Sequence, residues 1–109
     1  MKHVKIKPLS VNQAWQGKRF KTDKYRWFES EMLLKLPKFE VPKGKLFINI
    51  IVCYSSNASD IDNFLKPFLD CLQKKYGFND KQIYKLHVEK VISKDEGFWF
   101  EIMDYEKIH

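Results

Sequence analysis

A nearly continuous apolar run from Leu46 to Tyr54 constrains the fold of this 109-residue chain more than any other feature. The run is rich in Ile and Val and has the length of a strand, so it predicts a central strand that is buried on both faces. A small polar segment, residues 55–59, then delivers the chain to Asp60 and Asp62. In open α/β sheets, sites form beyond the carboxyl ends of the strands. We therefore expect the candidate site to follow this strand directly.

Alternation and helical spacing predict the elements that precede the central strand. Apolar and lysine residues alternate over residues 4–7, which predicts a short strand that Pro8 ends. A helix is expected next, capped by Thr22 or Asp23 and ended by Pro37. Its apolar stripe, expected in the core, consists of Tyr25, Phe28, Met32 and Leu36.

A second helix is expected after the central strand, from about Asp62 to Lys75. Asp62 would be its N-cap or lie just outside it, because Pro67 is tolerated only near the first turn of a helix. Asp70 is interpreted as a solvated helix residue. Alternation over residues 84–89 and 98–103 predicts two further strands joined as a hairpin, with His87 on a solvated face.

The order of these elements is strand, helix, strand, helix, strand, strand. It indicates an α/β (α+β) fold, with one domain over residues 1–109, a mixed sheet of about four strands and two main helices. No apolar run approaches the roughly 20 residues of a membrane span, and the N-terminus lacks the apolar core of a signal peptide. We expect a cytoplasmic protein with no membrane partner, in which Cys53 and Cys71 are buried free thiols.

Charge is divided unevenly between the two halves of the chain. The total is +6, but residues 1–50 hold 12 Lys and Arg against 4 Asp and Glu, whereas residues 51–109 hold 8 against 10. A basic half can bind the phosphates of a nucleic acid, although a solvated lysine-rich surface is the alternative. Residues 10–21 show no clear period, so they form either a DNA-contacting segment or a loop pinned by two aromatic residues. The candidate DNA contacts are Trp15, Lys18, Arg19, Lys21, Lys24 and Arg26.

Three carboxylates lie at the ends of expected elements: Asp60, Asp62 and Asp80. Such oxygen ligands suit a hard divalent cation such as Mg²⁺. Lys66 follows Asp62 by one helical turn and would share its face of the helix. Carboxylates, a metal and a cation are the parts needed to hydrolyse a phosphodiester. The alternative is that Asp62 and Asp80 are only a cap and a turn residue.

Three segments together resemble the RusA family of Holliday-junction resolvases. They are DIDNFLKP at residues 60–67 with Leu69 and Asp70, NDKQI at residues 79–83 leading to Lys90, and PLSVN at residues 8–12 with Trp15. Their order and spacing agree with the family and cover most of the chain. The second segment has Asn79 where an acid is usual, and residues 55–59 lack the basic residues that many members carry before the first aspartate.

The resemblance implies a small endonuclease that acts as a homodimer and cuts four-way DNA junctions in recombination and repair; many members are encoded by phages or prophages. It implies that Asp60, Asp62 and Asp80 bind Mg²⁺, for which Mn²⁺ can substitute, and that Lys66 is the essential lysine. Asn12 and Lys90 join the candidate DNA contacts. Two alternatives stay open: a non-catalytic, structure-selective DNA-binding protein, and a nucleotide-sugar enzyme with a D-x-D motif. Against the second are the chain length and the lack of a glycine-rich nucleotide motif.

Overall fold

The computed structural model describes residues 1–16, 20–58 and 60–107. The two predicted helices and the predicted strands are present in the predicted order, and the structure adds the short elements α1, β2 and β3 and two 3₁₀ helices, η1 and η2. In chain order the elements are β1 (Lys2–Val4), α1 (Val11–Ala14), β2 (Trp15–Gln16), β3 (Phe20–Lys21), α2 (Asp23–Lys35), β4 (Leu46–Tyr54), α3 (Leu65–Tyr76), η1 (Asp80–Gln82), β5 (Ile83–Ile92), β6 (Gly97–Asp104) and η2 (Tyr105–Lys107).

β4 is an inner strand of a four-stranded mixed sheet with the order β1-β6-β4-β5. It pairs in parallel with β5 and antiparallel with β6. Helix α3 is the crossover between the parallel pair, so β4, α3 and β5 form a βαβ unit. The mixed sheet and the element order confirm the predicted fold class. The predicted hairpin is wrong, because β5 and β6 lie on opposite sides of β4.

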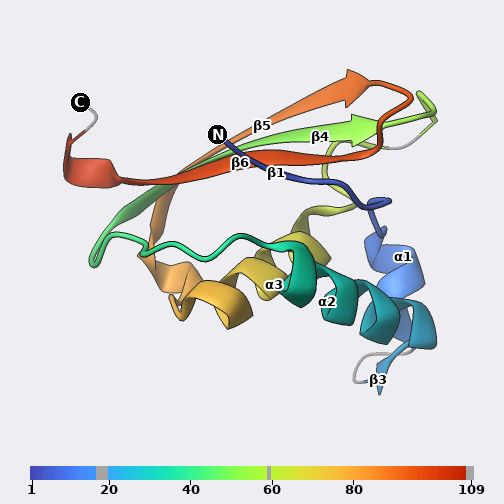
Figure 1. Ribbon diagram of the computed structural model, residues 1–109, viewed down its shortest axis with the longest axis horizontal. Helices are drawn as coiled ribbons and strands as arrows, with labels where there is room; N and C mark the ends of the chain where they lie inside the picture. Colours follow the sequence, from blue (N-terminus) through green and yellow to red (C-terminus); the bar gives the residue numbers. More distant parts are fainter. Residues whose placement is uncertain (17–19, 59, 108–109) are drawn as a thin grey trace.

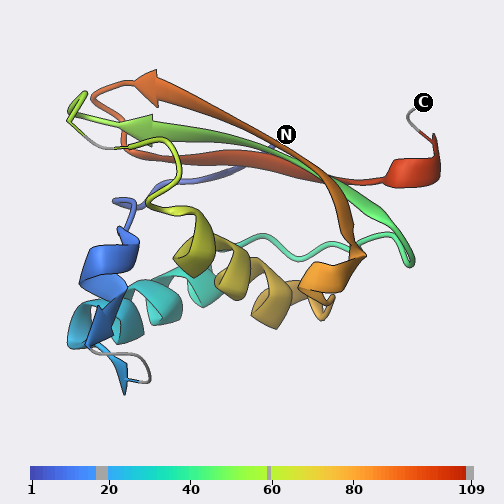
Figure 2. The same cartoon turned by 180° about the vertical axis from the view of Figure 1, so that it is seen from behind.

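The helices α1, α2 and α3 lie on one face of the sheet, as Figures 1 and 2 show from opposite sides. The side chains of Ile48, Ile50 and Val52 point to this face and are fully buried. The alternate residues Phe47 and Ile51 are only half-buried. The prediction that this strand is buried on both faces is therefore wrong for its helix-free side.

Aromatic side chains join the helical layer to the sheet. The ring of Phe68 in α3 stacks on that of Phe98 in β6 with their centroids 4.2 Å apart. Phe28 of α2 meets the same Phe98 ring edge-on, at a centroid distance of 6.5 Å. Both helices therefore pack against Phe98, and this contact positions α3 and the residues on its outer face.

Helix α2 begins and ends where the sequence predicts. Thr22 is its N-cap, and its hydroxyl oxygen accepts a hydrogen bond from the amide of Tyr25 at 3.2 Å. Leu36 is the C-cap and precedes Pro37. The predicted apolar stripe is buried, and Cys53 and Cys71 are buried free thiols, as expected.

The early part of the chain differs from the prediction. Strand β1 covers Lys2–Val4 rather than residues 4–7, because its partner β6 pairs with those three residues. Residues 10–21, which have no sequence period, contain α1 and the short paired strands β2 and β3. A tertiary hydrogen bond helps to hold this segment: the amide of Thr22 donates to the carbonyl of the fully buried Ala14 at 3.0 Å. Within the described residues, no helix has the length and apolar character needed to cross a membrane.

Candidate active site

Asp60 and Asp62 lie in the turn between β4 and α3. The helix begins at Leu65, three residues after the approximate start predicted at Asp62, and its N-cap is Phe64. Of the two predicted places for Asp62, the one outside the helix is therefore correct, and the N-cap is not. Pro67 is consequently in the first turn, where its missing amide costs little. The backbone carbonyl of Asp62 accepts a hydrogen bond from the Leu65 amide at 3.1 Å. The carboxylates of both aspartates are exposed to solvent.

Tyr54, the last residue of β4, lies close to both aspartates. Its hydroxyl donates a hydrogen bond to the backbone oxygen of Asp60 at 3.4 Å. Burial, together with the negative charges of Asp62 and Asp60, raises the pKa of Tyr54 to about 12. One hydroxyl therefore experiences both carboxylates. Asn63 adds a further contact, because its Nδ2 donates to Oδ2 of Asp60 at 3.4 Å.

A groove of about 370 Å³ runs along the outer face of α3. The side chains that α3 contributes to it follow one another at helical spacing, so the helix itself brings these to one face. Asp80 reaches the same groove because the chain reverses at Gly77, which has a left-handed φ of 72°. The amide of Asp80 then donates to Oε1 of Gln73 at 3.0 Å. The lining residues are Asp62, Leu65, Lys66, Leu69, Asp70, Gln73 and Asp80.

Asp80 is the first residue of η1 but does not cap it. The capping oxygen belongs to Asn79, whose Oδ1 accepts from the Lys81 amide at 2.9 Å. Gln82 completes a capping box by accepting from the Asn79 amide at 2.9 Å. Asn79, which stands where the sequence motif usually has an acid, therefore serves as the cap of η1. The exposed carboxylate of Asp80 takes no part in capping and faces the groove.

The structure thus brings Asp62, Asp80 and Lys66 to one groove, with Asp60 placed beside it through Tyr54 and Asn63. Within the described part of the chain, no group of three or more His, Cys, Asp or Glu side chains is close enough to hold a metal ion. The three aspartates are therefore neighbours along one surface and not a closed cluster in a single chain.

Asp70 is a site residue that the sequence analysis missed. It is half-buried, so the prediction of a solvated residue is wrong. Its Oδ2 accepts a hydrogen bond from the Tyr25 hydroxyl at 3.1 Å and lies 3.6 Å from Nζ of Lys66. Burial and the charge of Asp70 raise the pKa of Tyr25 well above its ordinary value, so Tyr25 stays a donor. The spacing of Lys66 and Asp70 is visible in the sequence, but the contact with Tyr25 is not.

Glu29 joins α2 to the far end of α3. Its two carboxylate oxygens contact Nζ of Lys21 at 2.9 Å and Nζ of Lys74 at 3.0 Å. Burial alone acts to raise the pKa of Glu29, but the hydrogen bonds from Lys21 and Lys74 outweigh it and lower the pKa. Lys21, a predicted DNA contact, therefore has a structural partner.

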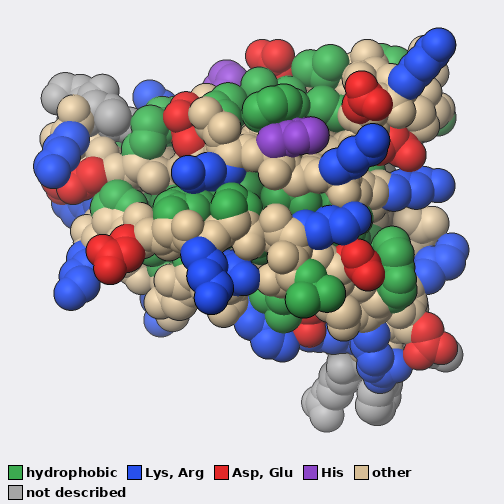
Figure 3. All heavy atoms as spheres, in the orientation of Figure 1, with side chains coloured by type: hydrophobic (Ala, Val, Ile, Leu, Met, Phe, Trp, Pro, Cys, Tyr) green, Lys and Arg blue, Asp and Glu red, His purple; other side chains and the backbone are tan. Residues whose placement is uncertain are grey.

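The other predicted DNA contacts are scattered over the surface. Lys24 and Arg26 are exposed on α2, and Arg26 pairs with Asp23 at 3.0 Å. Lys90 lies opposite the buried Val52, which places it on the helix-facing side of β5. Lys18 and Arg19 lie outside the described residues, as do the side chains of Asn12 and Trp15. Figure 3 shows Lys and Arg side chains spread across one face of the molecule, with Asp and Glu between them.

Comparison with known proteins agrees with this arrangement. The family model for Endodeoxyribonuclease RusA matches residues 10–103. This stretch contains β4, α3 and β5, together with Asp60, Asp62 and Asp80. A search of curated proteins finds no match. Since the matched stretch makes up most of the chain, this protein belongs to the RusA family of endodeoxyribonucleases.

Proposed function

We propose that this chain is a Mg²⁺-dependent endonuclease that resolves four-way DNA junctions in recombination and repair. The observation that carries the proposal is the groove along α3, which Asp62, Asp80 and Lys66 line together. Acidic oxygen ligands beside a lysine are suited to phosphodiester hydrolysis. The family match supports a nuclease, and the groove supports the type of reaction.

Asp60, Asp62 and Asp80 would hold the cation. Mg²⁺ usually takes one or two protein carboxylates and completes its shell with water and substrate phosphates, so it does not need a closed cluster of three. Exposed carboxylates beside an open groove fit that requirement, and they equally fit Mn²⁺. When bound, the cation would polarise the scissile phosphate and lower the pKa of the attacking water.

Lys66 supplies positive charge where the phosphate gains negative charge during hydrolysis. Its ammonium group pairs with the carboxylate of Asp70, which in turn accepts a hydrogen bond from the Tyr25 hydroxyl. The groove is open to solvent, so a DNA backbone can enter along its length. Phosphate contacts of this kind position the DNA without reading its sequence.

The proposal includes a homodimer. A four-way junction has near two-fold symmetry, and its resolution needs two paired cuts. A two-fold dimer with one groove on each subunit presents two equivalent sites to such a substrate.

The test is cleavage of a synthetic four-way junction beside a linear duplex, with Mg²⁺ or with EDTA. Wild type is compared with Asp62→Asn and with the matched variant Glu89→Gln, which makes the same charge change on the helix-free side of β5. We expect paired nicks in the junction alone with Mg²⁺, their loss in Asp62→Asn, and unchanged cutting by Glu89→Gln. Junction binding without cutting under Mg²⁺ or Mn²⁺ would favour the non-catalytic alternative. Equal cutting of the duplex would contradict junction selectivity.

A further inference from the structure

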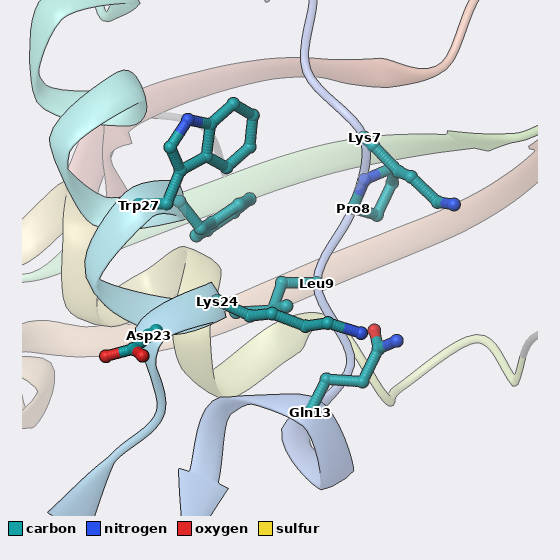
Figure 4. A pocket seen from close by; sticks show the side chains of 8 residues that line it. Lys7, Pro8, Leu9, Gln13, Asp23, Lys24 and Trp27 are labelled. Atoms are coloured by element: carbon teal, nitrogen blue, oxygen red, sulfur yellow. The ribbon is translucent and has the colours of Figure 1, made fainter.

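A second groove lies between helix α2 and the segment that precedes α1. Its volume is about 420 Å³, within the range of about 300–1,000 Å³ that is usual for small-molecule sites. Figure 4 shows Trp27 on one side of the groove and Lys7 and Pro8 on the other. The lining residues are Lys7, Pro8, Leu9, Gln13, Asp23, Lys24, Trp27 and Phe28.

The groove combines an aromatic wall with flanking positive charge. Trp27 comes one position before Phe28 of the buried stripe of α2, yet it is 58% exposed, so its indole is not part of the core. Lys7 and Lys24 flank the groove, and neither forms an ion pair with any residue that the structure describes. The carboxylate of Asp23 points away from Trp27 and is paired with Arg26 at 3.0 Å.

This groove borders a hollow that reaches residues next to Asp60. A neighbouring hollow of about 410 Å³ shares Lys7, Pro8 and Gln13 with it and extends to Tyr54 and Asn63. Asn63 in turn contacts Asp60. The hollow, which Glu96 also lines, therefore separates the Trp27 groove from the turn that carries Asp60.

We propose that the Trp27 groove binds an unpaired nucleobase of the DNA substrate, stacked on the indole, while Lys7 and Lys24 contact the flanking phosphates. The proposal rests on the proposed function, which supplies DNA as the ligand. Stacking on an aromatic side chain accepts any base, because every base has a π-face. Bases next to a branch point can leave their pairs more easily than bases inside a duplex. The groove would then favour branched over linear DNA without reading a sequence.

The test uses the full chain in EDTA, so that binding is measured without cleavage. Two fluorescently labelled duplexes are compared by anisotropy: one carries a single unpaired adenosine, and the other carries an abasic residue at the same bulge. We expect Trp27→Ala to weaken binding of the adenosine duplex about tenfold, in line with the loss of one stacked base, and to leave the abasic duplex unaffected. Trp27→Phe should retain most of the affinity.

The matched control is Trp99→Ala, which removes a tryptophan that is 41% exposed on β6 and stacked on His3. This variant should bind both duplexes as wild type does. Equal affinity of Trp27→Ala and wild type for the adenosine duplex would overturn the proposal, and so would an equal loss on both duplexes. Thermal unfolding of each variant shows that it is folded.

The two proposals fail in different ways. If wild type does not cut junctions but the Trp27-dependent preference for the adenosine duplex is present, the nuclease proposal fails and the base site stands. If junctions are cut by a Trp27→Ala variant that has lost no affinity for the adenosine duplex, the base site fails and the nuclease proposal stands.

Discussion

Nζ of Lys66 lies 3.6 Å from Oδ2 of Asp70, and the same oxygen accepts a hydrogen bond from the hydroxyl of Tyr25 at 3.1 Å. The lysine proposed to act on the phosphate is therefore directed by a carboxylate that a buried tyrosine orients. Lys66 and Asp70 are one helical turn apart, whereas Tyr25 comes from the other helix. The relative position of α2 and α3 thus bears on the orientation of Lys66.

Lys66→Ala should abolish most of the cleavage while junction binding persists. The lysine offsets charge that develops during hydrolysis, and removal of one such group typically lowers the rate by about 10²–10³-fold. Single-turnover cleavage of a four-way junction measures the loss, and anisotropy in EDTA measures binding. Lys85→Ala, which removes an exposed lysine from the helix-free side of β5, is the matched control and should cut normally.

Asp70→Asn should slow cleavage by about ten- to a hundredfold, because a poorly positioned group costs that much in rate. Asp70 acts through Lys66, so the two changes should not add: the double variant Lys66→Ala with Asp70→Asn should cut no more slowly than Lys66→Ala alone. Tyr25→Phe should have a smaller effect in the same direction. Full additivity in this cycle would contradict the positioning role of Asp70.

Glu29→Gln should remove a pH dependence of stability. The pKa of Glu29 is lowered below its ordinary value of 4.5 in the folded protein, since the hydrogen bonds from Lys21 and Lys74 outweigh burial. A lowered pKa means that the unfolded chain binds the proton more readily, so this contribution is present above pH 4.5 and is lost as the pH falls through the folded pKa. Urea unfolding between pH 7 and pH 3 measures this pH-dependent contribution to the free energy of unfolding.

The stability difference between wild type and Glu29→Gln should shrink across the acid range, whereas a constant difference would contradict the account. Glu31→Gln, which affects the more exposed pair with Lys35, should change stability less.

Gly97→Ala should destabilise the fold by about 1–3 kcal/mol, the usual cost of overpacking. Gly97 opens β6 with a φ of 155°, and a Cβ there would collide with the backbone oxygen of Val4 in β1. Gly44 is the matched control: its φ is 90°, but a Cβ added there meets no atom of the described structure within 4 Å. Gly44→Ala should therefore show only the conformational cost. Chemical denaturation of both variants measures the difference, and equal losses would contradict a role for the Val4 contact.

Local pattern predicted the elements with long, regular periods and missed what depends on contacts between them. Helix α2 was predictable because its stripe, its Thr22 cap and Pro37 all agree. The separation of β5 from β6 was not predictable. The short link between them would permit a hairpin, but each strand pairs instead with a different edge of β4. Residues 10–21 owe their structure to tertiary bonds such as that between Thr22 and Ala14, which leave no period in the sequence.

The candidate site divides in the same way. Asp62 and Lys66 line one groove, as the sequence predicts, although Asp62 lies in the turn before α3 and not on the helix itself. The placement of Asp80 there depends on the chain reversal at Gly77, and the role of Asp70 depends on Tyr25, 45 residues away. The assignment of Asp60, Asp62 and Asp80 as metal ligands stays a prediction.

The most direct test of the central claim uses a supercoiled plasmid that extrudes a cruciform, because the two kinds of cutting give different products. Two coordinated cuts across the junction make the plasmid linear, whereas a single nick relaxes the plasmid and lets the cruciform be reabsorbed. We predict linear product with wild type and Mg²⁺, and none with EDTA or with Asp62→Asn. Absence of cutting by wild type, or equal cutting of a plasmid without the cruciform, would contradict the account.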